Sequence, residues 1–353
     1  MARVLVLYGG RSAEHQVSCL SARSVLGALA TTTHEVVPVG ITRDGRWTLT
    51  DGRIAPVTEG RLPEVDGTGL TVGLVTGTDG PELVVFAADG SVTDRIPLDV
   101  AFPVLHGPGG EDGSVQGMLT TVGLRYVGAD VAASALGVDK AAMKGRFRLN
   151  GLPQVAHVAL ELERWQREAD IVREELARIP LPWFVKPARQ GSSIGITRVD
   201  DATELDAAIV EAARHDHRIV IEEGLTALRE LEVGILEEDG RVEVSCVGEI
   251  VPVNRFYDFD AKYVTPSRLE VPAVIDPGTA EAIEEVARRA FSAIGGRGMA
   301  RIDLFLAADG RLLLNEINTI PGFTEASMFP RVWAASGIDF TALVERLLVA
   351  ARA

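Results

Sequence analysis

The sequence predicts a mixed α/β protein, and three stretches of its 353 residues support that prediction. Residues 3–8 form a continuous apolar run, typical of a strand buried on both faces, and a glycine pair separates it from a helical pattern over 14–29. Residues 99–105 are a second such run before a glycine-rich loop. Residues 299–323 hold two apolar runs around Asp309-Gly310, a dipeptide typical of a two-residue hairpin turn. We therefore expect a doubly wound unit early in the chain and antiparallel hairpins later.

Length and composition indicate a soluble globular protein of two or three domains. The formal net charge of −15 argues against nucleic acid or an anionic membrane as a partner, because both would need a basic surface. The two cysteines, Cys19 and Cys246, form neither a disulfide framework nor the spacing of a metal site, which fits a reducing cytosol. The apolar run at the start is too short for a signal peptide, and no run reaches about 18 residues, so we expect a cytoplasmic protein.

The first strand–glycine–helix unit is expected to place a ligand site at the start of its helix. It is not a dinucleotide-binding fingerprint, because Gly-x-Gly-x-x-Gly is absent and no acidic residue ends the next strand, 35–40. Glu14, in the first helical turn, has two interpretations: a ligand contact, or a residue that offsets the helix dipole. Residues 41–98 are rich in Gly, Asp, Thr and Pro, and we interpret them as hairpins and loops inserted into the first domain.

A second candidate site is the loop that follows residues 99–105. The loop, residues 106–113, holds five turn-forming residues around His106 and two acids, and α/β sheets place ligands at such strand ends. The alternative is a tight loop that needs positive φ angles. A change of composition near 128–132 marks a domain boundary, and the helix beyond it carries Lys140.

Residues 183–199 follow a pattern of strand, small-residue loop and strand. A Walker A loop would place its lysine after the glycines and lead into a helix, whereas Lys186 precedes this loop. Two interpretations stay open. The loop around Ser192-Ser193 is either a flap that offers amides and hydroxyls to phosphate, beside the charge of Lys186, or a plain hairpin loop.

The last part of the chain contains further strands, a long loop and helices. A strand over 218–221 precedes a hairpin around Asp239-Gly240, and residues 255–268 form an irregular loop rich in aromatic residues. A helix begins near Asp276 and ends at a glycine pair, and the tail from residue 324 is helical.

The hairpin over 299–323 carries the strongest chemical signal. A two-residue turn at Asp309-Gly310 would pair Asp303 with Glu316 and, two positions further, Arg301 with Asn318, all on one face. Two carboxylates directly opposite each other destabilise a sheet unless positive charge lies between them. A bound hard cation such as Mg²⁺ or Mn²⁺ would supply that charge, and the alternative is a solvated polar face.

Seven motifs occur in order along the chain: Gly-Gly-Arg-Ser-Ala-Glu-His-Gln-Val-Ser (9–18), His-Gly-Pro-Gly-Gly-Glu-Asp-Gly (106–113), Asp139-Lys140, Lys-Pro-Ala-Arg-Gln-Gly-Ser-Ser-Ile-Gly (186–195), Phe-Tyr-Asp-Phe-Asp-Ala-Lys-Tyr (256–263), Arg-Ile-Asp (301–303) and Asn-Glu-Ile-Asn-Thr-Ile-Pro-Gly-Phe-Thr (315–324). With them the sequence resembles the D-alanine–D-alanine ligases, a branch of the ATP-grasp superfamily, nearly from end to end. Each motif alone is modest, but seven in order are specific.

The resemblance implies a fold and an activity. The fold would be a Rossmann-like N-terminal domain (1–128), a central ATP-grasp lobe (129–215) and a C-terminal ATP-grasp lobe with the metal site (216–353). The activity would be the ATP-dependent joining of two D-alanines through an acyl phosphate, with release of ADP and phosphate, for peptidoglycan precursor synthesis. Two Mg²⁺ or Mn²⁺ ions would be cofactors, and the enzyme would be a homodimer in the cytoplasm.

The resemblance also implies which residues bind ATP and metal. The metal ions would bridge the phosphates and be held by Asp303, Glu316 and Asn318. Phosphate contacts would come from Lys140, Lys186, Lys262, Ser192 and Ser193. The adenosine-binding segment would include Glu222, Glu223, Leu225 and Glu230, and Glu223 stands where relatives often have lysine.

The residues that would bind the amino-acid substrates are Glu14, His106, Arg301, Gly322 and Ser327. By resemblance, Glu14 would hold the ammonium group of the first D-alanine. Arg301 and the Gly322 amide would stabilise the tetrahedral oxyanion, and Ser327 would receive the carboxylate of the second substrate. By resemblance, the catalytic residues would include Glu14, Arg301 and Gly322, and also Ser192, whose loop would cover the phosphates.

Rival functions differ in class. A nicotinamide oxidoreductase would share the first strand–glycine–helix unit, but the fingerprint is missing. A non-catalytic nucleotide-binding module would have little reason to retain Arg301 and all three metal ligands. The nearest competitors are a D-alanine–D-lactate ligase and other ATP-grasp carboxylate–amine ligases. Tyr263, which by resemblance would be catalytic and hydrogen-bond toward Ser192 and Glu14, favours the dipeptide as product.

Overall fold

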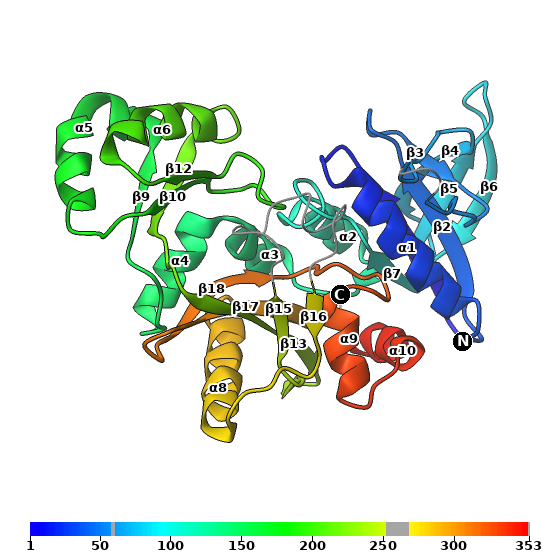
Figure 1. Cartoon of the computed structure of the whole chain (residues 1–353). Helices are drawn as coiled ribbons and strands as arrows, with labels where there is room; N and C mark the ends of the chain where they lie inside the picture. Colours follow the sequence, from blue (N-terminus) through cyan, green and yellow to red (C-terminus); the bar gives the residue numbers. More distant parts are fainter. Residues whose placement is uncertain (58–60, 252–267, 352–353) are drawn as a thin grey trace.

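The computed structural model describes residues 1–57, 61–251 and 268–351, and these form three β-sheets in succession along the chain (Figure 1). The strands of the first sheet come from residues 3–126, those of the second from 157–223, and those of the third from 228–318. The mixed α/β class expected from the sequence is confirmed. None of the helices in the described ranges is long and apolar enough to span a membrane.

The first sheet has eight strands in the order β6-β5-β4-β3-β2-β1-β7-β8. Its four strands β2, β1, β7 and β8 are parallel, and the other four form an antiparallel meander. The parallel strands are β1 (Arg3–Gly9), β2 (Glu35–Ile41), β7 (Val100–Pro103) and β8 (Arg125–Tyr126). The meander, β3 (Trp47–Leu49), β4 (Leu70–Thr76), β5 (Pro81–Phe86) and β6 (Val92–Pro97), is the predicted insertion of hairpins. The helices are α1 (His15–Leu29) and α2 (Ser114–Val122).

The second sheet is antiparallel, in the order β11-β10-β12-β9. Its strands are β9 (His157–Glu161), β10 (Trp183–Pro187), β11 (Thr197–Val199) and β12 (Arg218–Glu223). The helices α5 (Leu162–Leu176) and α6 (Leu205–Ala213) pack on this sheet and share a separate hydrophobic core with it, and the short 3-10 turn η1 (Ala202–Glu204) precedes α6. The loop between β10 and β11 holds Ser192 and Ser193, as the sequence pattern predicts.

The third sheet has the order β16-β15-β13-β17-β18, with β14 paired to β13. Its strands are β13 (Leu228–Glu238), β14 (Arg241–Val244), β15 (Gly248–Val251), β16 (Arg268–Glu270), β17 (Met299–Ala307) and β18 (Leu312–Asn318). One core joins this sheet to α3 (Val131–Val138), α4 (Lys140–Leu149) and α8 (Pro277–Ala293). The predicted start of α8 is confirmed, because Asp276 caps the helix by accepting from the Thr279 amide at 2.9 Å.

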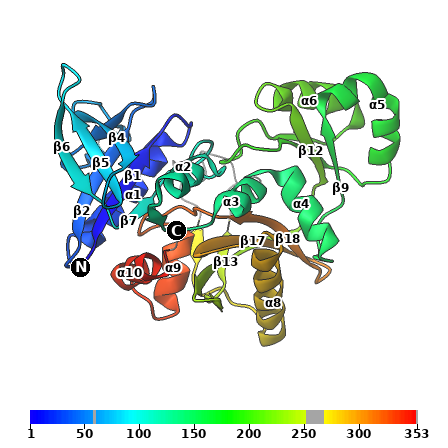
Figure 2. The same ribbon diagram turned by 180° about the vertical axis from the view of Figure 1, so that it is seen from behind.

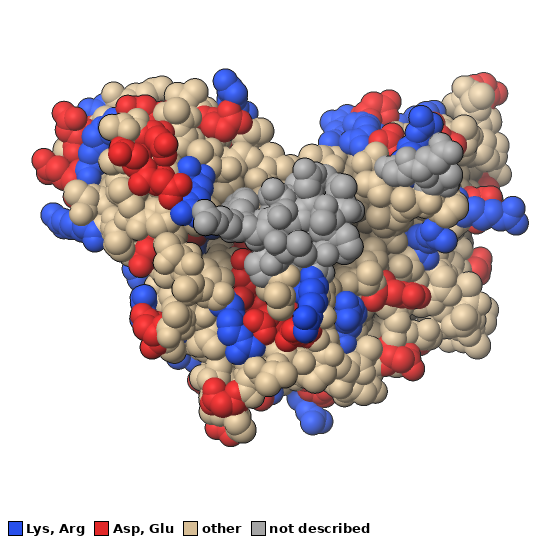
Figure 3. Space-filling model, viewed as in Figure 1, with Lys and Arg blue, Asp and Glu red and all other residues tan. Residues whose placement is uncertain are grey.

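A second core joins the first and third sheets. It combines Val4 and Phe102 of the first sheet with Met299 of the third. It also includes Trp333 and Leu347, from the C-terminal helices α9 (Met328–Ala335) and α10 (Phe340–Ala350). Seen from behind, these helices lie beside the first sheet while the lobe of β9–β12 stands at the opposite side (Figure 2). The surface is notched between that lobe and the lobe of β1–β8 (Figure 3).

The domain division at 128/129 and 215/216 stays a prediction. In the described structure, α3 and α4 share their core with the third sheet, whereas β12, which follows residue 215, pairs with β9 and β10 in the second.

Candidate active site

The hairpin of β17 and β18 pairs Asp303 with Glu316 and Arg301 with Asn318, which confirms the predicted register at these positions. The predicted two-residue turn is wrong. Leu306 pairs with Leu312, so the turn contains three residues, and the Ala307 amide donates to the Arg311 carbonyl at 2.9 Å. Leu304 pairs with Leu314, which leaves one extra residue, at position 315, as a bulge before Glu316. The longer turn shifts the pairing of the two strands by one residue, and the bulge at position 315 shifts it back, so Asp303 still lies opposite Glu316.

Arg301 links the carboxylates on this face of the hairpin. Its Nε and Nη2 atoms donate to Oδ1 and Oδ2 of Asp303, both at 2.7 Å, and Nε lies 3.0 Å from Oε2 of Glu232 on the neighbouring strand β13. Asn318 Nδ2 donates to Oδ2 of Asp303 at 3.1 Å. Burial would lower the pKa of Arg301, but Asp303 and Glu232 outweigh it and raise the pKa well above its ordinary value. Arg301 is therefore a permanent positive charge in the site.

The residues on this face fit a hard divalent cation. Asp303 and Glu316 offer carboxylate oxygens from paired positions, and Asn318 can add an amide oxygen, which are the ligand types that Mg²⁺ and Mn²⁺ prefer. Across the described ranges, no group of three or more His, Cys, Asp and Glu side chains is arranged to hold a metal. The candidate ligand set is therefore two carboxylates and one amide, completed by other oxygen donors such as phosphate or water.

A buried carboxylate, Glu222 at the end of β12, lies between two lysines. Lys186 of β10 donates to its Oε2 at 2.7 Å, and Lys144 of α4 lies 3.1 Å from its Oε1. Burial would raise the pKa of Glu222, but the two lysines outweigh it and lower the pKa to about 2. Burial also lowers the pKa of Lys144, against the opposing effect of Glu222. Lys144 donates in addition to the carbonyl of the bulge residue Asn315 at 3.5 Å.

Lys140 connects the hairpin to the loop between β10 and β11. Its Nζ donates to the Gln190 carbonyl at 2.7 Å and lies 3.8 Å from Oε2 of Glu316. Within that loop, Ser192 and Ser193 have φ angles of 48° and 60°, the left-handed region that residues other than glycine seldom adopt. The side chain of Ser192 from this loop reaches the N-terminal lobe.

Glu14 meets the same loop from the N-terminal lobe. It precedes α1, is buried, and accepts a hydrogen bond from the Ser192 hydroxyl, 178 residues away. Two glycines make room for it: a Cβ atom at Gly107 would lie 2.7 Å from Glu14 Oε2, and one at Gly191 would lie 2.9 Å from it. The neighbouring His15 is structural, since its Nδ1 bonds the Gly10 carbonyl at 2.6 Å.

His106 is buried and connects helix α1 to the segment that follows β18. Its Nδ1 lies 3.1 Å from the Ile320 carbonyl and its Nε2 lies 2.9 Å from the Ser21 hydroxyl. The Ser21 hydroxyl accepts from the Phe323 amide at 3.1 Å, so His106 and Ser21 together fix the turn that contains Gly322. Beyond that turn, Ser327 precedes α9, and its hydroxyl accepts from the Thr324 amide at 3.1 Å.

The remaining expected residues divide into two groups. Glu223 accepts from the Ala156 amide at 3.4 Å, Leu225 lies in the connection to β13, and Glu230 lies on β13. Lys262 and Tyr263 fall outside the described residues.

One continuous set of contacts joins three parts of the chain. It runs from Glu14 through the Ser192 loop and Lys140 to Glu316, and from Asp303 through Arg301 to Glu232. The sequence did not point to two residues near this site: Glu232 of the set, and Lys144, which contacts Glu222 and the Asn315 carbonyl beside it. Lys144 gave no signal beyond a charge on a helix, and Glu232 is one acid within a strand, so only the pairing of β13 with β17 reveals its role.

These features define a class of protein: an α/β protein whose cations and carboxylates converge where three lobes meet, a site suited to a phosphate-bearing substrate and a divalent metal. Residues 3–129 match the sequence model of the D-ala D-ala ligase N-terminus, and residues 147–349 match that of the D-ala D-ala ligase C-terminus. The chain belongs to the D-alanine–D-alanine ligase family.

Relatives match over nearly the whole chain. A D-alanine–D-alanine ligase of Mycobacterium sp. (strain KMS) is 49% identical, covering 98% of this chain and 95% of that protein. The ligase of Nocardia farcinica (strain IFM 10152) is 47% identical, covering 99% and 97%. Among solved structures, the D-alanine-D-alanine ligase from Coxiella burnetii has a TM-score of 0.83 at 30% identity, covering 99% of this chain and 93% of that one. The VanG D-Ala:D-Ser ligase from Enterococcus faecalis has a TM-score of 0.82 at 32% identity, covering 98% of both chains.

Proposed function

We propose that the protein joins two D-alanine molecules into D-alanyl-D-alanine, using ATP and releasing ADP and phosphate, to supply peptidoglycan synthesis. The main support is near-complete coverage by curated relatives that carry this activity in their names. The contact network described above agrees with it, because it brings carboxylates for metal and lysines for phosphate into one site. We infer a cytoplasmic homodimer from the same resemblance.

The chemistry requires that a carboxylate become a better electrophile. Transfer of the γ-phosphoryl group of ATP to the carboxylate of the first D-alanine forms an acyl phosphate and ADP. The amine of the second D-alanine then attacks the acyl carbon, the peptide bond forms, and phosphate leaves. Phosphoryl transfer depends on positioning and charge neutralisation more than on covalent groups of the protein. A site built of cations, carboxylates and backbone amides meets that need.

We assign ATP and metal to the junction of the second and third sheets, which would be the two ATP-grasp lobes. Lys140 and Lys186 would contact phosphates, with Lys262 joining them from outside the described residues. Asp303, Glu316 and Asn318 would hold the divalent ions, which supply charge neutralisation when bound. The loop of Ser192 and Ser193 would cover the phosphates, and the segment from Glu222 to Glu230 would line the adenosine.

We assign the amino-acid substrates to the side of the site that faces the first, Rossmann-like lobe. Glu14 would hold the ammonium group of the first D-alanine, and its bond with Ser192 ties that contact to the phosphate loop. Arg301 and the Gly322 amide would stabilise the oxyanion, and loss of one such donor typically costs about 2.7–4 kcal/mol in barrier. Ser327 would receive the second carboxylate. His106 would act by holding the turn that presents Gly322.

Product analysis tests the assignment. With D-alanine and D-lactate in competition and Mg·ATP present, we expect D-alanyl-D-alanine to predominate across pH 6–9.

We expect Tyr263→Phe to retain dipeptide synthesis but to gain measurable D-lactate use, because an apolar ring would weaken the link between Ser192 and Glu14. Predominant depsipeptide from the wild-type enzyme at pH 7.5 would overturn the proposal.

A further inference from the structure

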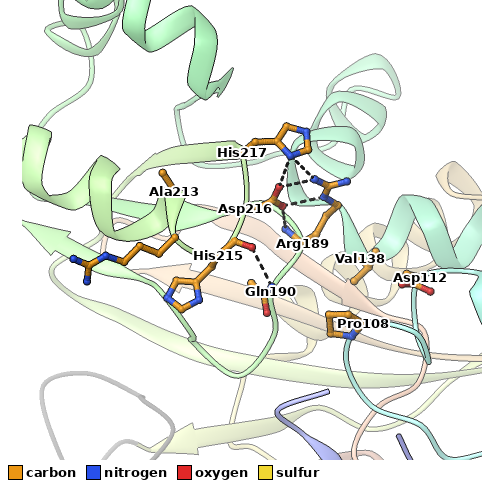
Figure 4. Close-up of a pocket in the computed structure, with 10 residues that line it drawn as sticks. Pro108, Asp112, Val138, Arg189, Gln190, Ala213, His215, Asp216 and His217 are labelled. Atoms are coloured by element: carbon orange, nitrogen blue, oxygen red, sulfur yellow. Dashed lines mark hydrogen bonds and ion pairs between the residues drawn. The ribbon is translucent and has the colours of Figure 1, made fainter. Parts of the chain in front are cut away.

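The loop of residues 188–196, which carries Ser192 and Ser193 between β10 and β11, is held at both ends by one turn. That turn, residues 214–217, connects α6 to β12. At the outer side of the loop, a cavity of about 500 Å³ lies between Arg189 and Gln190 and the residues Pro108 and Asp112 of the N-terminal lobe (Figure 4). Lys140 also bonds the start of the loop, because its Nζ donates to the Gln190 carbonyl at 2.7 Å and its amide donates to the Ala188 carbonyl at 2.9 Å.

Asp216 holds the start of the loop. Its Oδ2 accepts from the Arg189 amide at 3.0 Å and from Arg189 Nε at 2.9 Å, and its Oδ1 accepts from Arg189 Nη2 at 2.5 Å (Figure 4). Oδ1 also accepts from the Arg218 amide at 3.1 Å, which fixes Asp216 to β12. The carboxylate is buried, and burial would raise its pKa, yet the bonds from Arg189 keep the pKa of Asp216 below its ordinary value. Asp216 therefore stays charged in its role as an acceptor.

His215 holds the end of the loop. A Cβ atom on Gly195 would lie 2.5 Å from the Cδ2 atom of the His215 ring, so the ring packs directly on the backbone of Gly195. Gly195 also has a φ of 71°, a conformation that favours glycine. The His215 carbonyl accepts from Gln190 Nε2 at 3.4 Å. One pair of neighbouring residues thus touches both the start and the end of the loop.

We propose that His215 and Asp216 are positioning residues that clamp the loop over the phosphate site. This inference rests on the proposed function, because it assumes that Ser192 and Ser193 cover the phosphates of ATP. With both ends fixed, the left-handed backbone of the two serines is held in place before ATP binds, and their amides and hydroxyls need no ordering on binding. Neither His215 nor Asp216 is among the residues that we assign to substrate or metal.

The test compares Asp216→Ala with Arg189→Ala in the full-length protein. Asp216→Ala removes all three hydrogen bonds between Asp216 and Arg189. Arg189→Ala removes the two from the guanidinium but keeps the hydrogen bond from the backbone N–H of residue 189 to Asp216. Asp206→Ala is the matched control, because Asp206 accepts two bonds from Arg173 Nη2 in the same lobe, at 2.7 and 2.8 Å, but lies away from the loop. The measurements are hydrogen exchange of residues 188–196 without ligand, and kcat and KM for ATP.

We expect Asp216→Ala to speed exchange of residues 188–196 by about tenfold or more, with a smaller effect from Arg189→Ala and none from Asp206→Ala. We expect the KM for ATP to rise at least about fivefold in Asp216→Ala, with a smaller change in the KM for D-alanine.

Exchange that is unchanged at 188–196, or that rises equally throughout β9–β12, overturns the clamp. If Asp216→Ala does not fold, unchanged exchange in Arg189→Ala overturns it. A wild-type enzyme that forms no ADP with D-alanine would refute the proposed function, while the exchange measurement still decides the clamp.

Discussion

At the scale of single residues, the site is defined by charges that are buried and paired. Glu222 is nearly inaccessible to solvent, and its carboxylate lies against Lys144 and Lys186. A carboxylate in this position would be costly alone, and each lysine would be costly without it. The three groups therefore support one another, and they fix Lys186 where we expect phosphate to bind.

The depressed pKa of Glu222 predicts a pH-dependent contribution to stability. Its pKa is about 2 in the folded protein against an ordinary value of 4.5, so the stabilisation is complete above pH 4.5 and is lost as the pH falls toward 2. We expect the difference in free energy of unfolding between wild type and Glu222→Gln to shrink by about 3 kcal/mol over that interval. Urea unfolding at several pH values measures it.

A double-mutant series supplies the control for Glu222. In a Lys144→Met background one of the two lysines is gone, so Glu222→Gln should show a smaller dependence on pH between 4.5 and 2. A difference between wild type and Glu222→Gln that stays constant across this range would contradict the assigned ion pairs.

At the scale of elements, two hairpins with the same dipeptide behave differently. Asp239-Gly240 forms the two-residue turn, with φ angles of 50° and 81°, and Glu238 pairs with Arg241. At Asp309-Gly310 only Gly310 has a positive φ, of 86°, while the Asp309 carboxylate accepts from the Arg311 amide at 3.1 Å. This local bond favours the three-residue turn. The dipeptide predicts a hairpin in both places, but it does not determine the length of the turn.

The sequence therefore predicts the pairing of Asp303 with Glu316 correctly, although it predicts a turn that is one residue too short. The sequence reveals apolar runs, glycine turns and the order of motifs, and these sufficed for the strands around Asp303 and Glu316. It does not reveal bulges, because the extra residue at 315 leaves no mark in the apolar pattern. Nor does it reveal contacts between distant elements, such as Lys144 with Glu222 or Asp216 with Arg189.

Backbone conformation predicts that replacing glycine by alanine has opposite effects on stability at two positions, one in a turn and one in a helix. Gly310→Ala should destabilise the protein by about 1–2 kcal/mol, because Gly310 has a left-handed backbone that alanine disfavours. The new Cβ would meet no atom within 4 Å, so packing should not add to this cost. Gly145→Ala, in helix α4 and equally free of close neighbours, should stabilise it by about 0.8–1 kcal/mol. Urea unfolding of both variants tests this, and equal signs would show that packing rather than backbone conformation decides the outcome.

At the scale of the whole molecule, the three lobes are joined in two ways. The first and third sheets share a hydrophobic core through α9 and α10. The second sheet has a core of its own, and the lobe that it forms meets the others through polar contacts, among them Ser192 with Glu14, Lys140 with Gln190 and Arg218 with Asp139. Polar junctions between lobes allow relative motion more readily than a shared core does. The second lobe is therefore the part expected to move when ATP binds.

From the charge of the protein we expect ATP binding to depend on a metal ion. ATP is an anion, the chain carries a formal net charge of −15, and the proposed phosphate site contains Asp303 and Glu316 as well as lysines. We expect ATP with Mg²⁺ to stabilise the wild-type protein against thermal unfolding by about 2.7 kcal/mol at 100 times Kd, and ATP with a chelator to stabilise it much less. Thermal unfolding with each ligand alone and with both measures the difference.

Two variants of one hairpin decide whether that metal dependence belongs to the predicted ligands. Glu316→Ala should keep the fold but lose both the Mg²⁺-dependent part of the stabilisation and turnover, since the remaining carboxylate, Asp303, is already bonded by Arg301 at 2.7 Å. Asp309→Ala, at the exposed turn of the same hairpin, should retain both. If Glu316→Ala keeps the full stabilisation by Mg·ATP, Glu316 is not a metal ligand. If the chelator leaves the wild-type stabilisation unchanged, ATP binds here without a metal ion.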